Sequence, residues 1–377
     1  IFVGRGIGSD ALAAVNITAP LFLISTGVGL MFGVGASVVA SIHLAQGKVK
    51  AARINVTQAV AVSSLLLAAY SFLITSCARE VALLLGSSER LLPLAVEYMH
   101  WFAPFLPFSA LLSSGMFFIR LDGSPNYAML CNAVPAVINI VLDPILIFGF
   151  GLGVRGAAIA TVLSQAVGAV WILRFLTGKK TILRLRKDYM RPEKKVILPV
   201  MALGVSTFVM MSTESLLSIS FSSSLARYGG DVAVGAMTVI TSASQLCTLP
   251  IQGICQGGQP VMSFNFGAGK KSRVKEAFRF QLLLCGCYTC LFWLLMMLAP
   301  GAVAGIFTSD TALIDYTTWS MRIYMAGIFA MGFQIACQQS FMALGQAKVS
   351  LLLACLRKLI LLIPLIFILP HVVANPV

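Results

Sequence analysis

The sequence predicts an all-α, polytopic membrane protein, and three observations carry this prediction. Of the 377 residues, 58% are hydrophobic and only 11% are charged, whereas a soluble domain carries about 25% charged residues. Apolar stretches long enough to cross a hydrocarbon core, which takes about 20 helical residues, recur along the whole chain. Lys and Arg concentrate in every second connection between these stretches. The lengths fit helices rather than the shorter strands of a transmembrane barrel.

Ten spanning helices are expected in order along the chain. Interior prolines such as Pro104 and Pro107 predict bends in the longer ones, which must tilt or bend to fit the bilayer. The expected spans are approximately 12–45, 54–77, 91–119, 126–149, 155–176, 196–226, 234–265, 276–299, 312–342 and 349–370.

The basic residues predict the orientation of these spans. Of the 27 Lys and Arg residues, 19 lie in alternate connections, six lie in the other connections, and Arg357 and Lys358 lie inside the last span. Because Lys and Arg accumulate on the cytoplasmic side of membrane proteins, the richer connections are expected to be cytoplasmic. The net charge of +14 is therefore explained by topology, and we expect a lipid bilayer rather than a nucleic acid as partner.

The chain also contains an internal repeat. When the sequence is aligned with itself at one constant offset, Gly35 falls on Gly257, Gly47-Lys48 on Gly269-Lys270, and Gly123 on Gly345. We interpret this as two pseudo-symmetric six-helix lobes in parallel orientation, with binding expected between them. The repeat predicts a twelve-helix protein truncated at both ends, with most of the first helix and all of the last missing. The expected domains are an N-lobe at 1–177, a basic cytoplasmic linker at 178–195 and a C-lobe at 196–377.

Asp143 is the strongest candidate for chemistry in the first lobe. An ionisable group inside a span costs about 2.5–3.5 kcal/mol, so it is a functional candidate by default. Asn132, Asn139 and Asp143 fall on one helical stripe. Pro144 has no N–H, which leaves the carbonyl of Ile140 as a spare oxygen one turn away. A carboxylate, an amide and a free carbonyl suit a proton or Na⁺.

The next span is expected to face this stripe. The turn Gly149–Gly153 places Thr161 at the depth of Asp143 on an antiparallel neighbour, and Gln165 follows one turn later. The alternative is that Asn139, Thr161 and Gln165 only hold helices together by hydrogen bonds.

In the second lobe, Glu214 follows Met210-Met211 inside a span. Flexible methionines beside a buried carboxylate suit a cavity for varied lipophilic cations, whereas the alternative is a Glu hydrogen-bonded to neighbouring Ser and Thr. Arg357 and Lys358 are expected to extend back to the cytoplasm, with lining a cavity as the alternative.

Other motifs do not predict an enzyme, a resident cofactor or a metal site. Gly151–Gly156 fits G-x-G-x-x-G, but a helix-length apolar run precedes it and no acid follows at the distance that dinucleotide binding needs. The cysteines lie in apolar runs without His or acidic partners for zinc. No His is paired with a nucleophile.

Several segments resemble the multidrug and toxic compound extrusion (MATE) transporters, in particular the bacterial MepA-like branch. They are Ile1–Gly6, Gly33–Ser37 with Gly47-Lys48, Leu142–Phe148, Gly153–Thr161, and Gln259-Pro260 with Ser263–Ala268. The likeness covers essentially the whole chain.

The resemblance implies a two-lobed antiporter of the bacterial inner membrane that exports cationic amphiphilic drugs in exchange for H⁺ or Na⁺. In the family, the N-lobe ion site uses an Asp on the first helix with an Asn, an Asp and a Thr, and the last three match Asn139, Asp143 and Thr161. Glu214 is similar in position to a Glu that some members use, whereas the counterpart of Asp143 in the second half is Leu365. We expect a monomer. The alternatives are a lipid-linked saccharide flippase of the same superfamily and a membrane scaffold or enzyme without transport.

Overall fold

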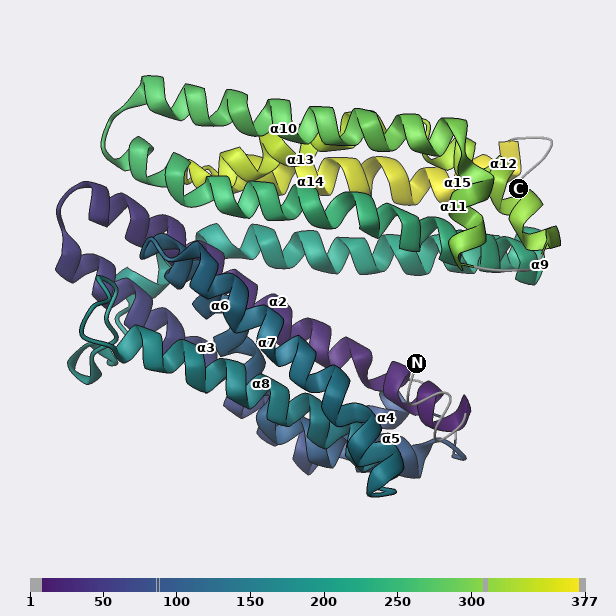
Figure 1. Cartoon of the computed structure of the whole chain (residues 1–377), viewed down its shortest axis with the longest axis horizontal. Coiled ribbons are helices and arrows are strands. Elements are labelled where there is room, and N and C mark those ends of the chain that lie inside the picture. Colours follow the sequence, from purple (N-terminus) through teal and green to yellow (C-terminus); the bar gives the residue numbers. More distant parts are fainter. Residues whose placement is uncertain (1–8, 86, 88, 308–310, 373–377) are drawn as a thin grey trace. The chain divides into compact units, whose positions relative to one another are not determined.

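The structure is a computed structural model that describes residues 9–85, 87, 89–307 and 311–372, and among these residues it contains helices and turns but no strand. The chain divides into two compact units, Ile1–Phe208 and Val209–Val377. Each unit is built of long helices joined by short connections (Figure 1). The predicted domain limits at 177 and 196 stay a prediction.

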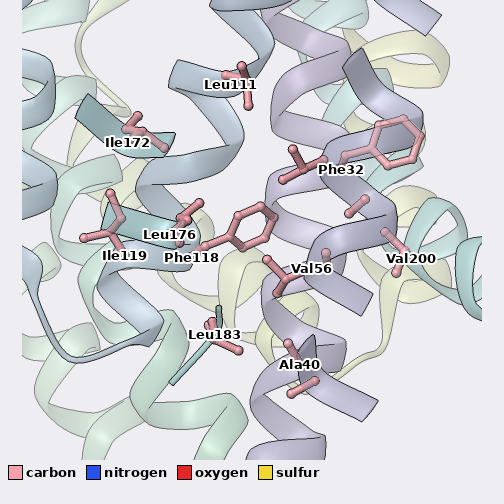
Figure 2. Packing of buried hydrophobic residues seen from close by; sticks show 14 of the residues in the cluster. Phe32, Ala40, Val56, Leu111, Phe118, Ile119, Ile172, Leu176, Leu183 and Val200 are labelled. Atoms are coloured by element: carbon pink, nitrogen blue, oxygen red, sulfur yellow. The ribbon is translucent and has the colours of Figure 1, made fainter. Parts of the chain in front are cut away.

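The first unit packs its helices around two apolar clusters. One cluster joins Phe32 on one helix to Phe118 and Ile172 on others (Figure 2). The outer faces are apolar too, with Phe72 75% exposed, which suits a surface against lipid. Its helices are α2 (Ser9–Ala45), α3 (Val49–Ser76), α4 (Ala78–Leu84), α5 (Leu92–Phe102), α6 (Leu106–Leu121), α7 (Pro125–Pro144), α8 (Gly153–Thr177) and the start of α9 (Lys194–Gly267).

Two glycine contacts bring α2 and the start of α9 close together within this unit. A Cβ built at Gly35 would clash with the carbonyl of Val200, and one at Gly204 would clash with the carbonyl of Met31. Small residues allow such backbone contact between membrane helices.

The span predicted at 91–119 is interrupted where its prolines lie. It consists of α5, a 3₁₀ turn at Ala103–Phe105 and α6, and together they form one apolar stretch, Leu92–Leu121. Pro104 lies inside the turn and Pro107 in the first turn of α6, so the regular α-helix is interrupted at the position where a bend is predicted.

The second unit repeats the helical frame of the first. The offset that aligns Gly47 with Gly269 also places both ends of α3 on those of α10 (Lys271–Leu298), and both ends of α6 on those of α13 (Ile328–Ala343). The turn glycines agree in conformation as well, because Gly47 and Gly269 both have positive φ, at 75° and 70°. The predicted repeat is therefore visible in the backbone. The remaining elements are α11 (Pro300–Phe307), α12 (Thr311–Tyr324), α14 (Ala347–Cys355), a π-helix η4 (Leu356–Leu362) and α15 (Ile363–Val372).

The helix α9 differs from the prediction of two separate spans at 196–226 and 234–265. It is assigned as 74 continuous helical residues, which if straight would measure about 110 Å, more than three hydrocarbon thicknesses. Between Val209 and Gly267 its ribbon runs out and back (Figure 1). The chain therefore reverses direction between the two predicted spans, although both lie within the residues assigned to α9.

Membrane-spanning helices account for most of the described chain. Eight helices are long and apolar enough to cross a membrane, and a ninth span is formed if α12 and α13 are taken together. These two helices meet at an angle of 51° within the stretch predicted as one span at 312–342.

Candidate functional site

Asp143 lies in the last turn of α7, at a break in the regular helix. Pro144 follows it, and the next residues form a π-helix η2 (Ile145–Gly149). The N–H of Phe150 donates to the carbonyl of Ile145 at 3.0 Å, five residues earlier. Because Pro144 has no N–H, the regular ladder cannot continue through it. Short π-helical turns within α-helices often occur at functional sites.

Asn139 and Thr161 join α7 to α8 near this break. The Nδ2 of Asn139 donates to the Oγ1 of Thr161 at 3.5 Å, and this Oγ1 donates to the carbonyl of Ala157 at 3.0 Å. Both residues are half-buried. The structure therefore brings together the two helices that the depth of the Gly149–Gly153 turn predicted to face each other.

The carboxylate of Asp143 is only partly satisfied. Its Oδ1 is buried and has no hydrogen-bond partner among the described residues. An unsatisfied buried polar atom costs about 1–3 kcal/mol, and more when it is charged. A bound proton or cation would remove this penalty, which makes the oxygen a candidate ligand.

Tyr98 on α5 completes the cluster and was missed by the sequence analysis. Its side chain is 8% exposed, interacts with Thr161 and lies within electrostatic range of Asp143. Its neighbour Glu97 forms an ion pair with Arg155 at the start of α8, which holds α5 against α8. The available signal was a phenol within an apolar span, since a buried tyrosine hydroxyl usually finds a polar partner.

Of the other predicted site residues, only Gln165 belongs to the same unit as this cluster. Gln165 lies one turn beyond Thr161 on α8 and is half-buried. Met211 belongs to the second unit and is 40% exposed. The side chain of Glu214 lies outside the described residues.

A buried basic network occupies the second unit and corrects the expectation for Lys358. Lys358 on η4 is 3% exposed, and its Nζ donates to the carbonyl of Met210 at 3.2 Å. Arg357 donates to Gln334 on α13, whose Nε2 donates to the Oε1 of Gln338 at 2.6 Å. The prediction that these side chains extend to the cytoplasm is therefore wrong for Lys358. The carbonyl of Met210 on α9 accepts a hydrogen bond from its head group within the span.

No metal site is evident among the described residues, which contain no group of three or more His, Cys, Asp and Glu side chains placed to hold an ion. The oxygens around Asp143 could instead accept a proton or coordinate a monovalent cation.

A duplicated bundle of membrane-spanning helices with ionisable groups buried inside its spans defines a polytopic membrane transporter. The MatE family matches residues 1–145 and 206–368, which is most of the chain. The protein belongs to this family, a family of membrane transporters and not of enzymes.

Relatives and solved structures agree with this assignment. The chain is 26% identical over 368 residues to the multidrug export protein MepA of Staphylococcus saprophyticus, covering 97% of this chain and 81% of the relative. It is 27% identical over the same length and coverage to MepA of Staphylococcus aureus N315. The relatives are bacterial, and the protein is a multi-span protein of the bacterial inner membrane.

The fold matches crystal structures of the same class. A MATE in complex with MaL6 superimposes with a TM-score of 0.92 at 22% identity, covering all of this chain and 85% of that one. An outward-facing MATE transporter of the MOP superfamily gives 0.91 at 22% identity, covering all of this chain and 83% of that one. The predicted all-α fold of the twelve-helix MATE class is confirmed.

Proposed function

We propose that the protein exports organic cations in exchange for H⁺ or Na⁺, by alternating access between its two lobes. The observation that carries this proposal is the buried Oδ1 of Asp143, which has no partner among the described residues and lies at a π-helical break. Asn139 and Thr161, which join α7 to α8 there, supply further oxygens for a small cation.

Coupling requires that the ion bind one conformation better than the other, because a ligand shifts an equilibrium only by its differential affinity. Protonation or Na⁺ binding at Asp143 neutralises the carboxylate and removes its desolvation penalty in the conformation that buries it. Each elementary charge carried inward gains about 2.3 kcal/mol per 100 mV of membrane potential. This supply of free energy is large enough to drive export against a gradient.

The substrate class follows from the relatives and from the predicted cavity. The staphylococcal relatives are named multidrug export proteins. Met211, Glu214 and Gln165 are proposed to contact the substrate, with a flexible methionine for varied apolar groups and a carboxylate for a positive charge.

Reconstitution in proteoliposomes tests the proposal. Ethidium transport is measured with a proton gradient and a Na⁺ gradient imposed separately, for the wild type and Asp143→Asn. The matched control is Asp315→Asn, which removes an exposed carboxylate on α12. We expect one gradient to drive wild-type and control transport and neither to drive the Asp143 variant. Wild-type rates in Asp143→Asn would overturn the assignment.

The same vesicles separate the alternatives. A lipid-linked saccharide flippase would translocate a fluorescent lipid pyrophosphate without ethidium flux. A scaffold or membrane enzyme would show no ion-dependent flux of either compound.

A further inference from the structure

The basic segment 178–193 is packed against the first unit rather than extended as a free linker. Leu183 is fully buried in the same apolar cluster as Phe118 and Leu176 (Figure 2). The N–H of Leu185 donates to the carbonyl of Leu176 at 2.9 Å, so the segment folds back onto the end of α8.

Hydrogen bonds from α3 and from the residue that follows α6 hold this segment in place. One oxygen of Asp122 accepts the N–H groups of Ile182 at 2.7 Å and Leu183 at 3.0 Å. The Nε of Arg53 donates to the carbonyl of Ile182 at 2.7 Å. Gln58 holds the other end, where its Nε2 donates to the carbonyl of Arg191 at 2.7 Å. The segment is therefore ordered before any ligand binds, which lowers the entropic cost of binding.

A pocket of about 640 Å³ lies between this segment and the adjoining ends of α7 and α8. Its rim carries three exposed cationic side chains, those of Arg174, Lys179 and Lys180. The acid at the pocket, Asp122, already uses one oxygen to accept two backbone N–H groups. The pocket is therefore suited to an anion.

Two further features supply hydrogen-bond donors for an anion. The 20-residue helix α7 begins at Pro125, directly after Ser124, which lines the pocket and whose side chain makes no capping hydrogen bond. The first N–H groups of a helix are unpaired and favour negative charge. Thr181, which also lines the pocket, is 6% exposed, and its Oγ1 has no hydrogen-bond partner among the described residues.

Aromatic side chains indicate where this pocket lies relative to the membrane. The ring of Tyr127, which lines the pocket, lies 4.7 Å from that of Phe175 and 5.7 Å from that of Trp171, measured between centroids. Tyr and Trp are enriched at membrane–water interfaces, and the basic segment places this interface on the cytoplasmic side. The available anions there include the phosphates of anionic lipids, which basic segments near the membrane attract.

We propose that this pocket binds the phosphate head group of an anionic phospholipid from the cytoplasmic leaflet. Arg174, Lys179 and Lys180 contact the phosphate, and Tyr127 contacts the glycerol and upper acyl region. Bound lipid would link the segment that leads into α9 to the membrane surface.

Thermal unfolding of the purified protein in detergent tests the proposal, with added phosphatidylglycerol compared with phosphatidylcholine. The variant is Arg174→Gln/Lys179→Gln/Lys180→Gln. The matched control, Lys187→Gln/Lys194→Gln/Lys195→Gln, removes the same charge from exposed positions that do not line the pocket. We expect phosphatidylglycerol to stabilise the wild type and the control, and the pocket variant to lose apparent affinity on the order of 100-fold.

Two outcomes would overturn the lipid site. An equal loss in both triple variants would indicate general attraction to a charged surface. Stabilisation by inorganic phosphate equal to that by phosphatidylglycerol would indicate a site for a free anion. Thr181→Val supplies a variant of unchanged charge, for which we expect a several-fold loss of affinity at the same elution volume in size-exclusion chromatography.

Discussion

The two units place opposite charges on the same helical frame. The span Pro125–Gly149 of the first unit corresponds, at the offset of the repeat, to the span Ala347–Ile368 of the second. Both contain a π-helix, η2 in the first and η4 in the second. Asp143 lies two residues before η2, whereas Lys358 lies inside η4. The offset of the repeat places η2 on residues 367–371 rather than on η4, so neither the π-helices nor the charged side chains follow the repeat.

The two charges also differ in how they are satisfied. The Oδ1 of Asp143 is buried without a partner among the described residues, whereas the Nζ of Lys358 donates to the Met210 carbonyl beside a glutamine network. An unsatisfied group can gain an ion, whereas a satisfied one stabilises the helices that it joins. This comparison suggests a role in coupling for the acid and a role in helix packing for the base.

Asp143→Asn should give the largest effect and should separate transport from stability. We expect gradient-driven export to fall on the order of 100-fold, because the group that changes charge is lost, which corresponds to about 2.7 kcal/mol. The apparent melting temperature should not fall, since no partner of Oδ1 among the described residues is left unpaired. Transport and thermal unfolding measured on the same preparation test this, and a fall in stability matching the fall in transport would contradict it.

Lys358→Met should show the opposite pattern. Removal of the ammonium leaves the Met210 carbonyl with one donor fewer and disrupts a connected buried network, which costs about 1–3 kcal/mol. We therefore expect a melting temperature several degrees lower. Lys348→Met, which removes an exposed lysine near the start of α14, is the control and should change stability by less than about 0.5 kcal/mol. If Lys358→Met leaves the melting temperature unchanged, Lys358 has no role in helix packing, and the proposed difference between Lys358 and Asp143 is wrong.

Thr161→Val tests the link between α7 and α8. Thr177→Val is a matched control on the same helix, because both hydroxyls donate to the carbonyl four residues earlier but Asn139 donates only to Thr161. We expect Thr161→Val to raise the half-saturating concentration of the coupling ion about fivefold, the equivalent of about 1 kcal/mol for one hydrogen bond. Equal effects in both variants would assign Thr161 to helix stability alone.

The structural features that the sequence predicts are those that depend on hydrophobic periodicity and on the spacing of turn residues. The helix bounds repeat between the units because the glycine turns, which need positive φ, recur at one constant spacing, as Gly47 and Gly269 or Gly123 and Gly345 do. The length of the turn predicted that Thr161 faces the helix of Asp143, and the residue on that helix that contacts Thr161 is Asn139, one turn before Asp143. The burial of Lys358 could not be predicted this way, because its partner Met210 lies on a helix far away in sequence.

The break between α12 and α13 was missed for a related reason. The corresponding interruption in the first unit has Pro104 and Pro107 to mark it, whereas the 51° bend in the second has only Gly327 next to it. A glycine permits a bend without requiring one. Tyr98 was missed because its role depends on the packing of α5 against α8, which periodicity and spacing do not predict.

Tyr98→Phe should produce the smallest effect of these substitutions, because it removes a single hydroxyl group from the first unit. The substitution keeps the ring packed on Phe102, 5.5 Å away between centroids, and removes only the hydroxyl that interacts with Thr161. If the acid cluster binds the coupling ion, this hydroxyl orients Thr161, and its loss should raise the half-saturating ion concentration about twofold to threefold, less than a full hydrogen bond is worth. Tyr316→Phe on α12 of the second unit is the control and should leave the ion dependence unchanged. A change in the maximal rate without a change in ion dependence would place Tyr98 in helix packing, and the coupling role would then depend on Asp143, Asn139 and Thr161.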